Sequence, residues 1–336
     1  MLERIARDRV ATLFIVTFVV LLLVGAAAPG FLSMRTASII WSNGLVLMLV
    51  ALGIFPVILT RNIDVSGGSI LGLSAVTLGL TVNAGASLPV AIAAALGAGV
   101  AAGAVNGALV ALLGVPSIVA TLGTLGLFRG VMLIATGGEW IEELPEGVKD
   151  LAGNSVLGLS VMGGVTLALI GIVWGILRLR RGRWVMAVGD NRDAARHLGL
   201  PVRRIEFLAF VWAGAMASVA GITFAAQIGF VPSQAGSGME LRAIAALVLG
   251  GISLLGGVGS VGGVVIGVIF FTSIDTALVF LKIPAYWNDL IGGAMLLLVL
   301  LIDGRLRIAL EARDRAARYH RADSAHSHTV KLEDAA

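Results

Sequence analysis

The chain contains no cysteine among its 336 residues, and charged residues are scarce, at 13%. The lack of cysteine excludes disulfide bonds, thiolate catalysis and cysteine-ligated metal sites. Soluble domains carry about 25% charged residues, so this chain has too little charge to cover the surface of a water-soluble protein. The hydrophobic content of 58% and the mean hydropathy of +0.98 therefore predict that most of the chain lies in lipid.

Sequence motifs of several enzyme and transporter classes are missing as well. The three lysines, Lys149, Lys282 and Lys331, stand in no nucleotide-binding P-loop, so the chain does not itself carry an ATPase site. It has no HExxH metal motif and no nucleophile elbow, and we expect no catalytic residue, no bound cofactor and no metal. Few carboxylates and no histidine lie inside apolar runs, so a proton relay of the secondary-transporter kind is poorly supplied.

Apolar runs of membrane-spanning length occupy most of the chain. A spanning helix needs about 20 apolar residues, and ten runs are candidates. They are residues 10–28, 40–59, 68–83, 88–113, 117–136, 157–177, 206–227, 241–256, 259–281 and 287–302. The first run ends in an Ala-x-Ala sequence typical of signal peptides, but it exceeds the usual length of a signal and is interpreted as an uncleaved helix. The predicted fold class is an all-α integral membrane protein with about ten transmembrane helices.

Charged loops predict the orientation of these helices. Residues 178–204 hold eight arginines, whereas residues 137–156 hold five carboxylates and one lysine. One predicted span separates the two loops, and arginine-rich loops stay in the cytoplasm. The N-terminus, residues 60–67 and the C-terminus are therefore expected in the cytoplasm. We expect residues 1–305 to form the transmembrane domain and residues 306–336, which contain a His-Ser-His sequence, to form a solvated tail.

The segment TRNIDVSGGS, residues 60–69, places polar residues and a glycine pair between two apolar runs. Arg61 and Asp64 would face each other on a continuous helix, but the glycines indicate that the helix ends here. A break at membrane depth is tolerated only where it faces protein or a water-filled cavity. We interpret the segment as a hinge-like break at the end of a pathway helix.

Glycine patterns suggest further breaks and close helix contacts. ISLLGG, residues 252–257, aligns with IDVSGG, residues 63–68, which indicates either a parallel duplication of helices or chance. GVGSVG, residues 257–262, fits a dinucleotide-binding pattern, but its long apolar flanks favour a break between two spans. Glycines spaced four residues apart, which let helix backbones approach closely in lipid, occur as Gly99, Gly103 and Gly107, and as Gly259, Gly263 and Gly267.

Ionisable and polar side chains inside apolar runs are costly and are therefore candidates for function. They are Arg129, Asp275, Asn106 and Gln227. For Arg129, a structural ion pair or snorkelling to the outer surface competes with a role in a transport pathway. Asp289, beside two aromatic residues, is typical of a membrane-interface belt.

The arginine-rich loop contains the signal for a short helix, GDNRDAARHLG. Asp190 or Asn191 is suited to cap this helix, and Asp193 would lie in its first turn. Gly199 ends the pattern and Pro201 stops it. A short capped helix between two spans is either a docking element for a partner or an amphipathic helix on anionic lipid.

Four segments together resemble the permease subunits of bacterial ABC importers for monosaccharides, in the ribose-type branched group. They are RNIDVSGGSI, GVPSIVATLGTLGLFRGVMLI, GDNRDAARHLG and AALVLGGISLLGGVGSVGG. The resemblance covers about residues 40–305. Within the group, TGGEWIEELPE, the segment that begins AAQIGFVPSQ and the segment that begins KIPAYWNDLI look most similar to autoinducer-2 importer permeases, with rhamnose importer permeases next.

The resemblance implies a type II importer-like fold in the bacterial cytoplasmic membrane. A second permease copy or paralogue, an ABC ATPase subunit that holds ATP and Mg, and a periplasmic or lipid-anchored sugar-binding protein would complete the importer. The implied substrate is autoinducer-2, rhamnose or a related monosaccharide. Membrane lipid is a further expected partner, and nucleic acid is not expected to bind. The implied ATPase-coupling residues are Asp190, Asn191, Arg192, Asp193, Ala194, Ala195, Arg196, Leu198 and Gly199.

A pathway lined by amides and hydroxyls would suit a neutral, hydroxyl-rich sugar. The predicted pathway residues are Asn62, Asp64, Ser66, Ser69, Asn106, Arg129 and Gln227. The alternative is a stand-alone secondary transporter or channel for a small polar solute, which needs a coupling site near the bilayer midplane. A membrane scaffold without transport activity is a third class.

Overall fold

The structure is a computed structural model that describes residues 9–28, 30–153, 155–156 and 159–284, with residues 287, 290, 292–294 and 297. The chain divides into two units, Met1–Asp289 and Leu290–Ala336. All the helices and strands whose bounds are given below belong to the first unit. Asp289, the predicted tail at 306–336 and most of the predicted span at 287–302 lie outside the described residues.

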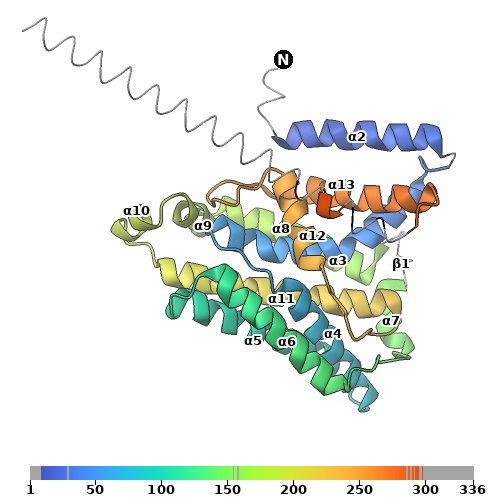
Figure 1. Ribbon diagram of the computed structural model, residues 1–336, viewed down its shortest axis with the longest axis horizontal. Helices are drawn as coiled ribbons and strands as arrows, with labels where there is room; N and C mark the ends of the chain where they lie inside the picture. Colours follow the sequence, from blue (N-terminus) through green and yellow to red (C-terminus); the bar gives the residue numbers. More distant parts are fainter. Residues whose placement is uncertain are drawn as a thin grey trace, which may run out of the picture. The chain divides into compact units, whose positions relative to one another are not determined.

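The first unit is almost entirely helical where it is described (Figure 1). In chain order its helices are α2 (Arg9–Ala27), α3 (Met34–Leu59), α4 (Gly67–Asn83), α5 (Leu88–Gly107), the π-helical turn η1 (Ala108–Leu112), α6 (Ser117–Thr136), α7 (Glu146–Gly153), α8 (Val161–Arg178), α9 (Arg180–Asp190), α10 (Arg192–His197), α11 (Val202–Ile228), α12 (Met239–Leu249) and α13 (Val261–Phe280). Two short antiparallel strands, β1 (Ser155–Val156) and β2 (Leu159–Ser160), pair Ser155 with Ser160.

Seven described helices are long and apolar enough to cross a membrane, namely α2, α3, α5 with η1, α6, α8, α11 and α13. They confirm a nearly all-helical protein with several candidate membrane spans, although the count of ten spans is not confirmed within the described residues. α4 is apolar but has 17 residues. The predicted run at 241–256 is wrong as a continuous helical span, because α12 has only 11 residues. Its helix stops before Gly251, Gly256 and Gly257, whose positive φ angles turn the backbone.

Polar caps and left-handed glycines fix where several helices begin and end. Ser33, Ser160 and Ser260 precede α3, α8 and α13, and each side chain accepts a hydrogen bond from a backbone N–H in the first turn. Gly137 and Gly229 end α6 and α11 with φ angles of 66° and 81°. The chain therefore turns sharply at both ends of its long helices.

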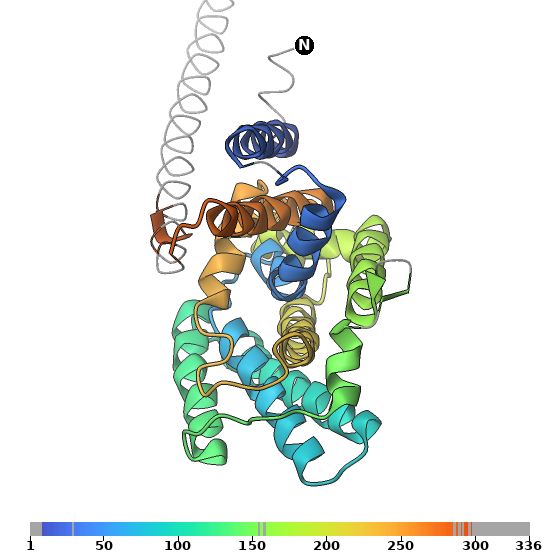
Figure 2. The same cartoon turned by 90° about the vertical axis from the view of Figure 1, so that its right-hand side faces the viewer.

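α11 lies at the centre of the first unit, surrounded by α3, α4 and α5 (Figure 2). Small residues allow this close packing. A Cβ atom at Gly99 would collide with Ser218 and the Gly214 carbonyl, and one at Gly103 would collide with the Phe210 carbonyl. The predicted close approach along Gly99, Gly103 and Gly107 is thus confirmed.

The second predicted glycine set is only partly correct. Gly263 and Gly267 lie on α13 and pack against the Gly250 and Ala246 carbonyls at the end of α12. Gly259, however, precedes the helix and lies against Phe55. Only two of the three glycines therefore form a helix contact, and the third lies in the preceding loop, because α13 begins only at Val261.

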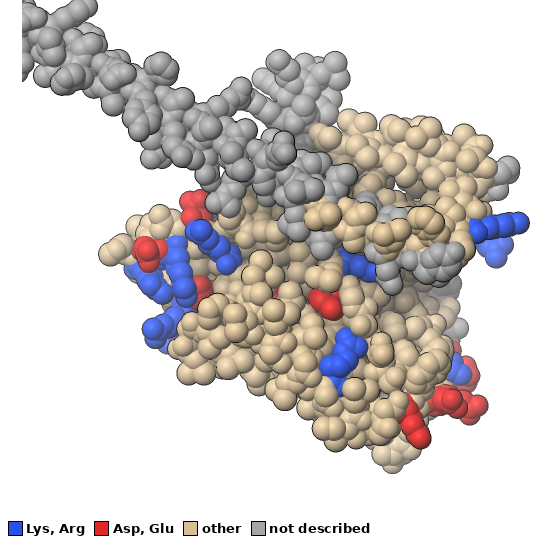
Figure 3. Space-filling model, viewed as in Figure 1, with Lys and Arg blue, Asp and Glu red and all other residues tan. Residues whose placement is uncertain are grey.

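The basic and acidic loops lie at opposite ends of the helices. Arginines gather over α9 and α10, whereas carboxylates gather near α7 (Figures 1 and 3). The sequence predicted opposite sides for residues 178–204 and 137–156, and the fold agrees. The charge separation runs along α11, which begins beside α10 and ends beside α7.

Candidate functional site

The predicted helix break between residues 60 and 69 is confirmed. α3 ends at Leu59 and α4 begins at Gly67, and the residues between them are not helical. Arg61 adopts a positive φ of 65° and is exposed, whereas Asp64 is buried. Asp64 does not pair with Arg61. It accepts hydrogen bonds from Ser66 instead, so the polar contacts of Asp64 stay within the break.

A buried chain of polar side chains joins the break to α5 and α6. Asp64 Oδ1 accepts hydrogen bonds from the Ser66 N–H at 2.8 Å and from its hydroxyl at 2.6 Å. Ser66 Oγ accepts from Asn106 Nδ2 at 2.7 Å, and Asn106 Oδ1 accepts from Thr124 Oγ1 at 2.6 Å. All four side chains are buried. We call this chain the buried network; in a low-dielectric interior, its bonds support one another.

Two further hydroxyls hold the backbone of the break. Ser117 Oγ accepts from the Ile63 N–H at 3.1 Å, and Thr121 Oγ1 accepts from the Val65 N–H at 3.3 Å. The sequence prediction missed Ser117, Thr121 and Thr124. Their spacing of four and three residues along α6 places them on one helix face, and this polar stripe in an otherwise apolar run was a readable signal.

Asn106 stands at an irregular point of the chain. Gly107 is the last residue of α5, and the π-helical turn η1 begins at Ala108. Wide turns of this kind often occur at functional sites. Here the turn begins two residues after Asn106, the α5 residue that joins the buried network to α6.

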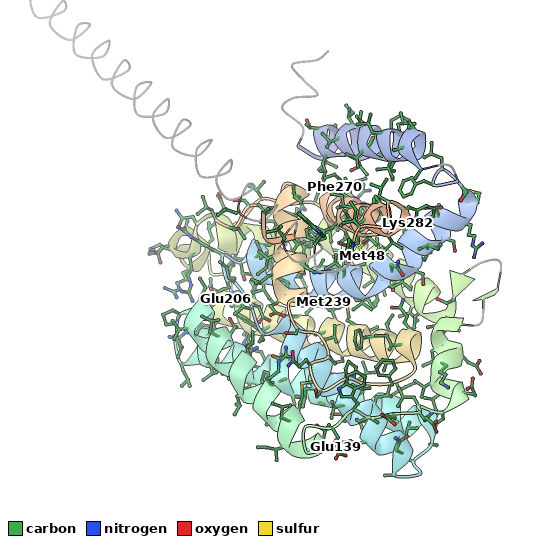
Figure 4. All side chains as sticks on the ribbon, turned by 45° about the vertical axis from the view of Figure 1, so that its right-hand side comes forward. Met48, Glu139, Glu206, Met239, Phe270 and Lys282 are labelled. Carbon is green, nitrogen blue, oxygen red and sulfur yellow. The ribbon has the colours of Figure 1, made fainter. Side chains whose placement is uncertain are left out.

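Glu240, at the start of α12, lies against the second glycine of the break. A Cβ atom at Gly68 would collide with the Glu240 carboxylate and with the Gly236 carbonyl. Glu240 is 7% exposed, and among the described residues no hydrogen-bond donor reaches its Oε2 atom or the Oδ2 atom of Asp64. Its neighbour Met239 lies near the middle of the helices (Figure 4). The sequence prediction missed Glu240, although its place at the start of an apolar helix was visible.

The remaining predicted pathway residues are spread over three places. Ser69 donates to the Ser66 carbonyl at 2.8 Å and belongs with the buried network, whereas Asn62 bonds to the Thr60 carbonyl and hydroxyl. Arg129 is half-buried and reaches the Ala235 carbonyl at 3.5 Å. Whether these residues line a transport pathway stays a prediction.

Gln227 lies at the other end of α11, away from the buried network. Its Nε2 atom donates to the Ser42 carbonyl at 2.7 Å. Together with Ser42, Asn43, Trp140 and Phe230, it lines an open cavity of about 960 Å³, which we call the Gln227 hollow. Asp275, another predicted candidate, is instead matched by Arg242 of α12 at 3.5 Å, which indicates a structural pair.

The glycine-rich segment at 252–257 meets the chain just before IDVSGG, at the end of α3 and the start of the break. The Gly257 N–H donates to the Leu59 carbonyl at 3.0 Å, and Gly256 packs against Arg61. Gly189, near the end of α9, also lies against the Leu59 carbonyl. The alignment itself is looser than predicted, because α4 begins inside IDVSGG whereas α13 begins four residues after ISLLGG.

The predicted short helix of the arginine-rich loop is present as α10, and Asn191 rather than Asp190 caps it. Asn191 Oδ1 accepts from the Ala194 N–H at 2.9 Å. Asp190 ends α9, and Leu198 and Gly199 follow α10, so the helix is shorter than the predicted segment.

α10 is anchored on one side and exposed on the other. Ala195 is buried against Val188 and Val202, and Arg192 bonds to the buried Glu206 of α11 at 2.7 Å. Glu206 lies toward the end that carries α10, whereas Glu139 lies at the opposite end (Figure 4). Of the implied coupling residues, all except Ala195 are exposed, namely Asp190, Asn191, Arg192, Asp193, Ala194, Arg196, Leu198 and Gly199.

Residues 36–300 match the family model of the branched-chain amino acid transport system / permease component. The autoinducer 2 import system permease protein LsrC of Salmonella typhi is 50% identical over 322 residues, which cover 96% of this chain and 93% of that protein. LsrC of Escherichia coli strain K12 / DH10B is also 50% identical, over 96% of this chain and 94% of that protein. No solved structure matches the chain.

Proposed function

This chain belongs to the family of branched-chain amino acid transport system permease components, and on that premise we propose that it carries autoinducer-2 or a related sugar-like solute into the cell. It is an ABC importer permease and a multi-pass protein of the bacterial inner membrane. The relatives that are 50% identical over nearly the whole chain carry the autoinducer 2 name. Rhamnose and related monosaccharides are the runner-up substrates.

The proposed topology has ten spans with both termini in the cytoplasm. The arginine-rich end with α9 and α10 then faces the cytoplasm, as the positive-inside rule requires. The end with α7 faces the cell exterior. Two of these spans, α4 and α12, are short helices whose crossing is completed by the non-helical backbone beside them, which is tolerated because protein surrounds their ends.

The proposed partners divide the work of import. A second permease copy or a paralogue completes the membrane unit, and a binding protein delivers the solute at the end that carries α7. A separate ATPase subunit binds ATP and Mg and docks on α10. The permease itself holds no cofactor and performs no chemical step.

The observation that carries this arrangement is the exposed and capped α10, fixed to the helices behind it. Gly189, the residue before the end of α9, lies against the Leu59 carbonyl, where the break begins. A displacement of α9 and α10 would therefore reach the break directly, and Asn62, Asp64, Ser66 and Ser69 would move with it. We infer that this contact passes ATP-driven motion to the pathway, in which Asn106, Arg129 and Gln227 also take part.

Uptake by reconstituted vesicles tests the transport activity. Vesicles that contain the permease with its ATPase, binding protein and ATP are expected to accumulate labelled autoinducer-2, and omission of any one component is expected to stop uptake. Uptake by this chain alone, driven by an ion gradient, would instead support a stand-alone transporter. If rhamnose enters and autoinducer-2 does not, the family assignment stands and the substrate is wrong.

A pair of surface substitutions tests the docking helix. Ala194→Asp together with Arg196→Glu places new negative charge on the exposed face of α10 and is expected to abolish co-purification of the ATPase. Glu139→Arg, an exposed charge reversal at the opposite end, is the matched control and should leave that association unchanged. Full ATPase binding by the α10 variant would disprove the assignment.

A further inference from the structure

The Gln227 hollow lies at the end of the helices opposite α10. Its walls come from the first half of α3, the loop before α7, α7 itself and the end of α11. With a volume of about 960 Å³, it has room for a small ligand and its water, since ligand pockets commonly measure about 300–1,000 Å³. It is separate from the buried network, whose four side chains are closed off by protein.

The floor of the hollow is polar although it lies inside a predicted span. Ser42 and Asn43 are exposed, whereas α3 is buried from Gly44 to Phe55. Ser42 lies eight residues into α3, which corresponds to roughly 12 Å along the helix axis. Polar side chains inside a spanning helix would be costly against lipid, and these two line the hollow, so we infer that they face water.

Charged residues at the hollow support the same conclusion. Glu142, Glu143 and Lys149 line it, and the Lys149 ammonium pairs with Glu146 at 2.8 Å. Such groups stay hydrated and keep acyl chains away. The hollow therefore connects with the aqueous phase at the end that carries α7.

The chemistry of the lining fits a neutral, hydroxyl-rich molecule. Asn43 and Gln227 carry amides that both donate and accept hydrogen bonds, and the Gln227 amide keeps its Oε1 acceptor after bonding to Ser42. Trp140 and Phe230 stack with ring centroids 5.6 Å apart and planes 11° apart. Trp140 is 56% exposed, so its ring offers a flat apolar surface to the C–H face of a small ring.

We propose that the Gln227 hollow is an entry site, in which the permease first binds a small polyhydroxylated solute before the solute reaches the interior. This inference rests on the proposed import function and adds a binding site for the solute. Asn43 and Gln227 contribute hydrogen bonds to hydroxyl groups, and Trp140 supplies the aromatic surface. The buried network then lies further along the route, near the α10 end of the molecule.

The absence of cysteine allows a direct test by thiol labelling. Ser42→Cys introduces one small thiol into the hollow without altering the Asn43 or Gln227 side chain. In right-side-out membrane vesicles that contain the full importer, a hydrophilic, membrane-impermeant thiol reagent is expected to label this variant. Leu47→Cys, one turn deeper on α3 and 6% exposed, should not react, and neither should Leu167→Cys, an exposed apolar position of α8.

Ligand protection then tests the binding site itself. Autoinducer-2, rhamnose and ribose are each titrated against the labelling rate of Ser42→Cys, with leucine as a control solute. At ten times its dissociation constant, a solute that binds in the hollow slows labelling about tenfold, and leucine does not. Adding Asn43→Leu to Ser42→Cys is expected to remove the protection while leaving the labelling rate without solute unchanged.

The outcomes separate this inference from the import function. If unmodified importer accumulates none of the three solutes, the proposed function fails. If it accumulates one of them and Ser42→Cys is either unreactive or equally reactive with that solute, the entry site is wrong. Solute protection that appears only in the presence of the binding protein would also overturn it, because the permease itself would then not bind the solute in the hollow.

Discussion

The buried network and the Gln227 hollow contain similar polar groups in opposite surroundings. Ser66 and Asn106 have no exposed surface and bond to each other. Ser42 and Asn43 are exposed and line the Gln227 hollow. The same residue types therefore serve two purposes, since one pair binds elements of the protein together and the other pair is free to bind a solute.

This difference predicts where substitutions affect folding and where they affect transport. A buried polar atom that loses its partner costs free energy, because no water replaces the lost bond. A polar atom at a hydrated surface loses little, because water does replace it. Substitutions in the buried network should therefore lower the stability of the protein, whereas substitutions in the hollow should lower only the uptake of solute.

Asn106→Leu is the substitution with the largest expected effect. It removes the bonds to Ser66 and Thr124 in a closed interior, and we expect a loss of about 3 kcal/mol in the free energy of unfolding. Asn43→Leu, the same change in the hollow, should cost less than about 0.5 kcal/mol. Both losses are measured by heating the detergent-purified variants and recording the temperature at which the monodisperse peak disappears. An equal loss of stability in the two variants would contradict the distinction between the buried network and the hollow.

The adjacent glycines of the break provide a second, smaller effect. Gly68→Ala forces a methyl group against Glu240 and the Gly236 carbonyl, and overpacking of this kind costs about 2 kcal/mol. Gly67→Ala is the matched control, because its new Cβ would lie 3.4 Å from the nearest atom, the Ile54 Cδ1. The same thermal assay compares the two. A stable Gly68→Ala variant would mean that α12 and the break are not held together as described.

The sequence predicted the helices well where composition alone decides them. Runs such as 117–136 coincide with a helix, and the glycine ladder from Gly99 to Gly107 predicted a close contact correctly. The run at 241–256 failed because hydropathy does not register that Gly251, Gly256 and Gly257 turn the chain. The end of α12 is set by the backbone conformation of these glycines and not by hydropathy.

The candidate site was predicted less completely than the fold. Asp64, Ser66 and Asn106 were identified because polar residues in apolar runs are conspicuous, and the structure brings them together. Glu240 was missed because its contact with Gly68 joins residues that are far apart in the chain. The Gln227 hollow was missed because α3 and α11 meet there only after folding. Long-range pairing of this kind leaves no local pattern to read.

Two arginines of α10 extend the comparison to the opposite end of the molecule. Arg192 bonds to Glu206, which is 2% exposed, whereas Arg196 pairs with Asp193, which is 84% exposed. Arg192→Ala leaves a buried carboxylate without its partner and should cost about 1 kcal/mol, since the arginine is itself half-exposed. Arg196→Ala should have no measurable effect on stability. Thermal unfolding of the two variants in detergent checks this difference.

Gln227→Leu is expected to have the smallest effect on stability and yet a clear effect on uptake. The side chain is exposed and donates one hydrogen bond, to the Ser42 carbonyl, so the free energy of unfolding should fall by less than about 0.5 kcal/mol. Uptake of the solute by the full importer should nevertheless decline, because the loss of one hydrogen bond to a neutral solute weakens binding by about 1 kcal/mol, or roughly fivefold. ATP hydrolysis stimulated by the binding protein should stay unchanged, because α10 and its contacts are intact. A variant that loses stability in proportion to uptake would show that Gln227 supports the fold of the α11 end and does not act on the solute.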